Sequence, residues 1–373
     1  MNIAFRADAS LQIGSGHVMR CLTLADALRA QGAECQFICR EQPGHLIELI
    51  RSKGYFVRPL PLPAFGMTQA IASSNSIVQS PLAHAAWLGV HQEQDAVETA
   101  DALQGWRLDW LVVDHYALDA QWEQVLAPYY RDLLVIDDLA DRSHVCSLLL
   151  DQNLGRKAAD YAYLVPASCQ VLAGPVYALL RPEFATLREY SLQRRQPPRL
   201  ENILISMGGV DQPNATALAL EALRCCELPT ACHISVIMGP KAPWLEQVRE
   251  LALKMPRPTA VLININDMAQ RMANCDLAIG AAGSTSWERC CLGVPGLMAI
   301  LAENQQAIAQ ALAECGAAYS IGSVADQGFV ADCAARVSEL LRKPEKLTGL
   351  SRVAAAVTDG SGCAAVLSWM LKQ

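Results

Sequence analysis

Short apolar runs alternate with amphipathic stretches along the first half of the chain. Runs at 2–7, 34–39 and 55–60 have the length of buried strands. Between the first two, apolar residues recur at helical spacing from Val18 to Leu28, and Gly32 follows as a helix-ending residue. This order is typical of βα units, and it predicts a mostly parallel sheet. Later runs at 110–114 and 133–137 each end in acidic residues.

A second series of the same kind begins near residue 202. A strand at 202–206, the Gly208–Gly209 loop and a helix at 214–223 repeat the opening of the chain. Further strands are predicted at 233–237, 260–263, 276–279, 296–300 and 318–321. We therefore predict an α/β protein with two Rossmann-like, doubly wound domains facing a cleft.

Three segments interrupt this pattern. Residues 188–200 are charged and contain proline, which predicts a linker between domains at 1–187 and 201–350. Residues 61–87 are rich in Pro, Ser and Ala without a period, which indicates a surface excursion. Residues 351–373 predict a pair of helices broken near Gly360 and Gly362.

Composition narrows the classes of function. The 373 residues are 52% hydrophobic and 18% charged, enough for two cores. A net charge of −7 disfavours a nucleic acid or an anionic membrane as partner. We expect no export signal, because Arg6 and Asp8 interrupt the first apolar run, and no membrane-spanning helix, because no apolar run approaches about 20 residues. The 14 cysteines lack metal-ligand spacing, so we expect reduced thiols, a cytoplasmic location and no metal or other cofactor.

The first candidate site is the loop between the first strand and the first helix. Gly14, Ser15 and Gly16 let backbone N–H groups converge on an anion, and His17 stands in the first helical turn. The helix dipole favours the neutral, proton-accepting imidazole, so His17 is a candidate general base. The alternative is that His17 only caps the helix. A dinucleotide site is disfavoured, because Met19 stands where a third glycine is needed and the second strand ends without an acidic residue.

The second candidate site is the small-residue loop from Gly280 to Glu288. Gly283, Ser284 and Thr285 allow a diphosphate to approach the backbone, and Glu288 can accept both hydroxyls of a ribose. The alternative is a capping box formed by Thr285 and Glu288.

Polar residues also follow other strands. The segments are Asp114-His115-Tyr116, Asp137-Asp138 and Glu303-Asn304-Gln305. A turn or a helix cap explains the paired Asp137 and Asp138 as well as a site does. Asp114 and His115 lack a neighbouring third ligand, which disfavours a metal.

The opening segment from Arg6 to Ala25, with Gly-Ser-Gly-His17-Val-Met-Arg20 at its centre, resembles the UDP-2,4-diacetamido-2,4,6-trideoxy-β-L-altropyranose hydrolases, the nucleotide-sugar hydrolases of pseudaminic acid biosynthesis. Further similar segments follow in the same order, at 113–116, 135–138, 206–209, 276–288 and 303–305. That family is similar to inverting glycosyltransferases of the two-domain GT-B type.

The resemblance implies UDP binding in the second domain and chemistry at the first glycine loop, with the C-terminal helices returning to the first domain. It implies that His17 is catalytic, with Tyr116 and Asn304 beside the sugar. The implied substrate-binding residues are Gly14, Gly16, Arg20, Gly208, Gly209, Gly283, Ser284, Thr285, Glu288 and Gln305. The expected reaction is attack of water on the anomeric carbon, with inversion and release of UDP. An inverting UDP-sugar glycosyltransferase and a non-catalytic UDP-sugar-binding subunit are the alternatives, and the oligomeric state stays open.

Overall fold

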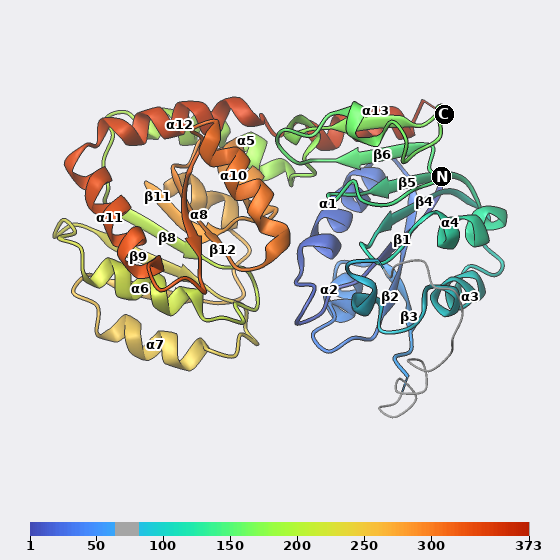
Figure 1. Cartoon of the computed structure of the whole chain (residues 1–373), viewed down its shortest axis with the longest axis horizontal. Coiled ribbons are helices and arrows are strands. Elements are labelled where there is room, and N and C mark those ends of the chain that lie inside the picture. The colour runs from blue at the N-terminus through green and yellow to red at the C-terminus, as the bar shows by residue number, and fades with distance from the viewer. Residues whose placement is uncertain (64–81, 373) are drawn as a thin grey trace. The chain divides into compact units, whose positions relative to one another are not determined.

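The computed structural model describes residues 1–63 and 82–372, which form two compact units (Figure 1). The first unit comprises Met1–Leu179 together with Ala364–Gln373, and the second comprises Leu180–Cys363. Both ends of the chain therefore belong to the first unit.

The first unit is built on a parallel sheet of seven strands in the order β3-β2-β1-β4-β5-β6-β7. Strand β1 lies between β2 and β4, so the direction of winding reverses between β1 and β4. In such sheets the loops at this reversal point form the usual binding site. The strands are β1 (Asn2–Ala7), β2 (Glu34–Arg40), β3 (Phe56–Leu60), β4 (Leu108–Asp114), β5 (Tyr130–Ile136), β6 (Leu148–Asp151) and β7 (Gln170–Ala173).

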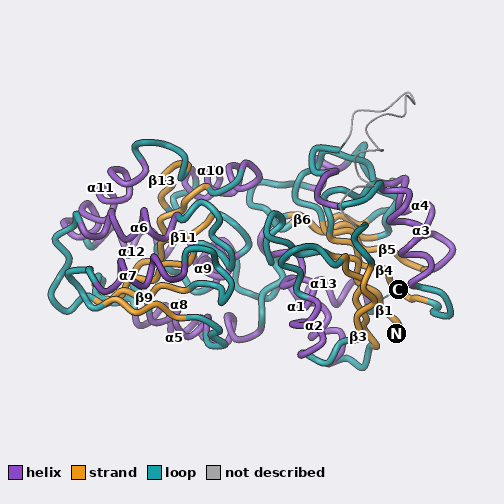
Figure 2. Tube along the Cα trace, turned by 90° about the horizontal axis from the view of Figure 1, so that it is seen from below, coloured by secondary structure: helices purple, strands orange, loops and turns teal. Residues whose placement is uncertain are grey.

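Helices cover both faces of this sheet (Figure 2). One core contains Ala4 and Leu111 of the sheet, packed with Ala96 of α3 and Trp122 of α4. Burial of alternate strand residues on opposite faces explains why these strands appear in the sequence as continuous apolar runs. The helices are α1 (Gly16–Ala30), α2 (Ile47–Ser52), α3 (Gln92–Ala102), α4 (Ala120–Leu126) and α13 (Gly362–Met370).

The second unit has a parallel sheet of six strands in the order β10-β9-β8-β11-β12-β13. Its reversal point lies between β8 and β11. The strands are β8 (Asn202–Ser206), β9 (His233–Ile237), β10 (Thr259–Leu262), β11 (Leu277–Ala281), β12 (Gly296–Ile300) and β13 (Tyr319–Ser323). The helices are α5 (Pro182–Arg194), α6 (Ala215–Arg224), α7 (Leu245–Leu253), α8 (Met268–Asn274), α9 (Thr285–Cys291), α10 (Gln306–Glu314), α11 (Phe329–Arg342) and α12 (Glu345–Val357).

The predicted class of two Rossmann-like α/β domains is confirmed, but the predicted linker at 188–200 differs from the structure. Residues 182–194 form helix α5 within the second unit. Arg188 holds this polar helix in place by donating to the carbonyl oxygens of Cys291 at 2.5 Å and Ala355 at 2.7 Å. Hydrogen bonds to the ends of α9 and α12 thus replace the apolar stripe that the segment lacks.

Two other predicted segments have different outcomes. The C-terminal pair occurs as α12 and α13, and only Ala364–Gln373 groups with the first unit. The segment Glu345–Met370 is long and apolar enough, by composition, to cross a membrane, although the sequence led us to expect no such helix. Residues 358–361 interrupt it, and its apolar side chains Leu347, Val366 and Met370 are buried. Of the excursion predicted at 61–87, residues 64–81 lie outside the described residues.

Candidate active site

The loop that precedes α1 lies at the reversal point of the first sheet. Ser10 shapes this loop: its Oγ accepts a hydrogen bond from the N–H of Ile13 at 2.9 Å, and its carbonyl oxygen accepts one from Gly14 at 2.9 Å. Gly14 has φ +80°, a left-handed conformation that favours glycine. Helix α1 then begins at Gly16, so His17 stands in its first turn. Ser15 makes no side-chain cap to this helix.

His17 pairs with Asp114, the last residue of the adjacent strand β4. The distance from His17 Nδ1 to Asp114 Oδ1 is 2.5 Å, and both side chains are buried. With the proton on Nδ1, the imidazole donates to the carboxylate and keeps the lone pair on Nε2 for accepting a proton. Asp114 therefore fixes the orientation of the His17 ring, a contact that the sequence alone did not reveal.

Arg20 lies one turn after His17 and fixes the same carboxylate. Its Nε donates to Asp114 Oδ2 at 2.6 Å and its Nη2 to Asp114 Oδ1 at 2.7 Å, a bidentate pair. Burial alone would raise the pKa of Asp114, but Arg20 and His17 outweigh it and hold that pKa well below its usual range. Asp114 is thus a permanent anion at neutral pH. Arg20 uses its guanidinium to hold Asp114 and Asp138, and its predicted contact with substrate stays a prediction.

Asp138 extends the cluster to Tyr116. Its Oδ2 accepts from Arg20 Nη1 at 2.6 Å and from the Tyr116 hydroxyl at 2.6 Å. The rings of Tyr116 and His17 meet edge to face, with centroids 4.7 Å apart. Burial, followed by the charge of Asp138, raises the pKa of Tyr116, so its hydroxyl stays protonated. The structure thus brings together His17, Arg20 and Tyr116, three of the residues predicted for the site.

His115 faces away from this cluster. Its Nε2 lies 3.4 Å from Asp8 Oδ2, within a buried ion network that contains Arg6. Burial lowers the pKa of His115, although Asp8 opposes the shift. Within residues 1–63 and 82–372, no group of three His, Cys, Asp or Glu side chains is arranged to hold a metal ion.

The second candidate loop, Gly280–Glu288, lies at the reversal point of the second sheet. Gly280 is required by packing, because an added Cβ would lie 2.6 Å from Arg289 Nη1 and 2.6 Å from the Ser206 carbonyl oxygen. At Gly283, in contrast, an added Cβ would meet nothing within 4 Å, so packing does not explain this glycine. The N–H groups of Gly283, Ser284 and Thr285 donate to no acceptor among the described residues. This run of free donors suits a diphosphate.

Glu288 does not close a capping box, since α9 begins without a side-chain cap. Its carboxylate is half-buried, with Arg181 Nη2 3.8 Å from Oε1. Burial raises the pKa of Glu288 to about 7, against the opposing charge of Arg181. The capping alternative is therefore wrong, and a weakly paired carboxyl is left beside the loop.

Gly208 and Gly209, the next predicted substrate-binding residues, follow strand β8 in the second unit. Gly208 has φ +92°, and the carbonyl oxygen of Gly209 approaches Gly239 so closely that a side chain there would collide with it. The N-terminus of the following helix, α6, is already occupied, because Asp211 accepts hydrogen bonds from Ala215 and Thr216 at 2.8 and 2.9 Å. The Gly208–Gly209 loop thus has no helix terminus to offer a phosphate.

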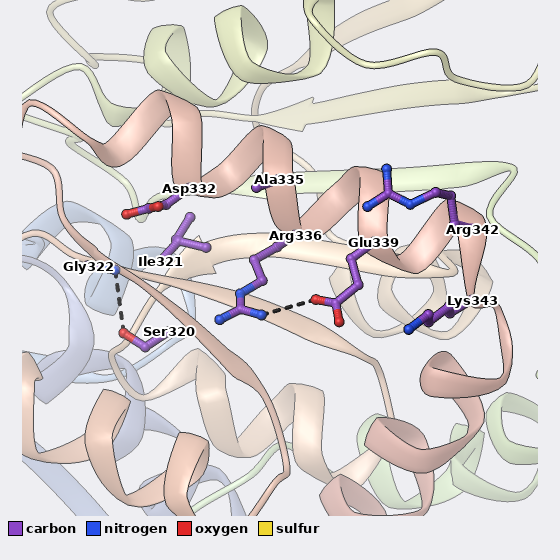
Figure 3. A pocket seen from close by; sticks show the side chains of 9 residues that line it. All are labelled: Ser320, Ile321, Gly322, Asp332, Ala335, Arg336, Glu339, Arg342 and Lys343. Atoms are coloured by element: carbon purple, nitrogen blue, oxygen red, sulfur yellow. Dashed lines mark hydrogen bonds and ion pairs between the residues drawn. The ribbon is translucent and has the colours of Figure 1, made fainter.

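Asn304 and Gln305 lie in the short helix after β12, Glu303–Gln305, in the second unit. Asn304 is exposed, and Gln305 Oε1 accepts a hydrogen bond from the N–H of Leu301 at 3.0 Å. A cavity of about 530 Å³ lies elsewhere in the same unit, between β13 and α11 (Figure 3). It is lined by charged residues such as Arg336 and Glu339, and none of the predicted site residues lines it.

Comparison with known proteins tests the resemblance. The chain is 28% identical over 316 residues to UDP-2,4-diacetamido-2,4,6-trideoxy-beta-L-altropyranose hydrolase of Campylobacter jejuni, covering 85% of this chain and 97% of that one. The predicted resemblance is confirmed. The chain is also 33% identical over 159 residues to the spore coat polysaccharide biosynthesis protein SpsG of Bacillus subtilis, covering 42% of this chain and 45% of that protein. No family model matches the chain.

Solved structures confirm the GT-B-like fold. MurG of Acinetobacter baumannii superposes with a TM-score of 0.68 at 18% identity, covering 100% of this chain and 99% of that one. Several glycosyltransferases match at similarly low identity. At this identity the likeness shows the fold alone, whereas the sequence relative is a nucleotide-sugar hydrolase.

Proposed function

We propose that this chain hydrolyses UDP-2,4-diacetamido-2,4,6-trideoxy-β-L-altropyranose, releasing UDP and the free sugar with inversion at the anomeric carbon. The observation that carries the proposal is the buried 2.5 Å pair of His17 and Asp114 at the reversal point of the first sheet. The hydrolase of Campylobacter jejuni, matched over 97% of its length, supports this choice of substrate.

In the proposed reaction His17 is the general base. Water attacks the anomeric carbon on the face opposite UDP while its proton passes to His17 Nε2, so one C–O bond forms as the C–O bond to UDP breaks. The bond electrons leave with UDP, a stabilised diphosphate that needs no strong general acid. The imidazolium formed in this step is stabilised by Asp114, whose carboxylate is already ionised. Tyr116 stays protonated and offers its ring beside His17.

In the same proposal the second unit binds UDP. The free N–H groups of Gly283, Ser284 and Thr285 receive the diphosphate, and Glu288 accepts the ribose hydroxyls. Gly14, Gly16, Gly208, Gly209, Asn304 and Gln305 stay predictions as substrate contacts. The cytoplasmic location and the absence of metal, nucleic-acid and membrane partners also stay predictions.

The test is UDP release from the UDP-sugar in the absence of any acceptor. Hydrolysis in ¹⁸O-labelled water should place the label on the sugar, and NMR of the first product should show the inverted anomer. The variant His17→Asn should retain UDP affinity and lose about 10²- to 10⁴-fold in kcat. Label on UDP, or unchanged turnover by His17→Asn, would contradict the mechanism.

The second candidate is an inverting glycosyltransferase, which the glycosyltransferases among the structural matches favour at the level of fold. A glycosyltransferase should release UDP slowly from the UDP-sugar alone and faster when an acceptor is present. A non-catalytic UDP-sugar-binding subunit predicts binding without turnover. The acceptor-free assay separates all three functions.

A further inference from the structure

The segment that begins at residue 82 places an aromatic residue beside the candidate base. Trp87 belongs to the short helix Ala85–Leu88. The next residue, Leu88, is buried in the core of the first unit, and Gln42 Nε2 donates to the Trp87 carbonyl oxygen at 2.5 Å. Gly89 follows with φ +76°, and an added Cβ there would lie 2.7 Å from Leu62. The backbone of Trp87 is therefore anchored by the fold.

The Trp87 ring completes an aromatic cluster with the site residues. It stacks on Tyr116, with centroids 5.7 Å apart and planes 28° apart, and it meets the His17 ring edge-on at 6.4 Å. His84 contacts both Trp87 at 4.3 Å and Tyr116 at 5.4 Å. The side of the His17 imidazole that faces Trp87 thus meets an aromatic ring and not a charged group.

Trp87 is only half-buried, and its indole N–H donates to none of the described residues. Because Trp87 is half-buried, a bound ligand can reach this N–H. The Trp87 ring lies close to His17, the proposed base at the anomeric carbon. It offers a ligand an apolar face and one hydrogen-bond donor. An acetamido group has the matching parts, a methyl group and a carbonyl acceptor.

We propose that Trp87 is a specificity-determining residue that recognises the 2-acetamido group of the sugar. The inference rests on the proposed function, because the carbon that bears this group is bonded to the anomeric carbon that His17 serves. The indole packs on the acetamido methyl, and its N–H donates to the acetamido oxygen.

The experiment compares two non-hydrolysable C-phosphonate analogues of the UDP-sugar, one with a 2-acetamido and one with a 2-hydroxyl group. Dissociation constants are measured by calorimetry for the wild type, Trp87→Phe and Trp87→Tyr. Trp87→Phe keeps a ring on Tyr116 but removes the N–H, so it should weaken binding of the acetamido analogue about tenfold and leave the hydroxyl analogue nearly unchanged. Trp87→Tyr, which restores a donor, should recover part of the preference.

The matched control is Trp369→Phe, an exposed tryptophan of α13 in the same unit. It should change neither constant. Equal losses for both analogues in Trp87→Phe, or no loss for either, would overturn the inference, as would a wild type that does not distinguish them. If the wild type binds the acetamido analogue more tightly yet hydrolyses no UDP-sugar, the proposed reaction fails while the binding ratio still decides the role of Trp87.

Discussion

Replacing Asp114 by Asn removes one charge from the candidate site at nearly constant volume. Asp114 uses both carboxylate oxygens, one toward His17 Nδ1 and both toward Arg20. Asn has only one oxygen, so its NH₂ group faces either Arg20 alone, in place of Oδ2, or both Arg20 and His17, in place of Oδ1. If it faces Arg20, two donors oppose each other. If it faces His17, the imidazole must present a lone pair at Nδ1 and carry its proton on Nε2, where the base is needed.

The expected effect on rate follows from the loss of the base. General-base assistance contributes about 10²- to 10⁴-fold, so kcat for UDP release should fall by about that factor. Leaving one buried donor unpaired should also reduce the free energy of unfolding by about 1–3 kcal/mol. This loss stays below that of a fully broken buried ion pair, because Arg20 keeps its 2.6 Å bond to Asp138.

The pH dependence of stability gives a second readout for Asp114→Asn. The pKa of Asp114 in the folded protein lies well below its ordinary value of 3.8. The ionised carboxylate therefore stabilises the wild type above about pH 4, and this contribution is lost as the pH falls below that value. The variant should lack this part of the acid dependence when unfolding is followed in urea between pH 2 and 7.

Glu123 provides a matched control for Asp114. Its Oε1 accepts from His144 Nδ1 at 2.6 Å, and both side chains are buried in the same unit. Glu123→Gln should thus lower stability by a similar amount while kcat stays near the wild-type value. If Asp114→Asn also retained the wild-type kcat, or if both variants lost activity in proportion to stability, the assignment of Asp114 as the group that orients His17 would be refuted.

Further substitutions test the second unit. Gly283→Ala should fold normally, since the space beside Gly283 is open. It should weaken UDP binding about tenfold, measured by calorimetry. Unchanged affinity would contradict the assignment of this loop to the diphosphate. Gly280→Ala is its control and should lose about 1–3 kcal/mol of stability, because its Cβ would collide with Arg289. The pKa of Glu288 is raised to about 7, so between about pH 4.5 and 7 the carboxyl ionises in the unfolded state before it ionises in the folded state. The free energy of unfolding of the wild type should therefore fall as the pH rises through this range. Glu288→Gln should lack this fall when unfolding is followed in urea. Asp211→Ala should cost about 1 kcal/mol of stability by removing the contacts of Asp211 at the start of α6, without changing UDP affinity.

Much of the sheet architecture follows from local pattern. Strands β1, β8, β9 and β12 begin and end at the predicted residues, because a parallel strand buried on both faces appears as a bounded apolar run. Strands β6 and β7 were not predicted. Each has four residues, and the two strands follow one another at the end of the first sheet.

Helix α5 shows where pattern misleads. Its sequence has the charges and the following prolines of a linker, and only Phe184 and Ser191 among its residues are buried. What makes it a helix of the second unit is the set of hydrogen bonds from Arg188 to carbonyl oxygens more than 100 residues away in the sequence. No local property of residues 188–200 encodes those acceptors.

The same contrast between local sequence pattern and contacts with distant residues applies to the candidate active site. The glycine loop predicts the position of His17, but its partner Asp114 lies 97 residues away and joins it only because β1 and β4 are neighbours. The alternation of side chains along a strand does not orient the tripeptide Asp114-His115-Tyr116, because β4 ends at Asp114 and the next two residues lie outside it. In the structure Asp114 and Tyr116 contact His17, and His115 lies toward Asp8. The order of the strands thus determines which acidic residue meets His17, and the tripeptide alone does not show it.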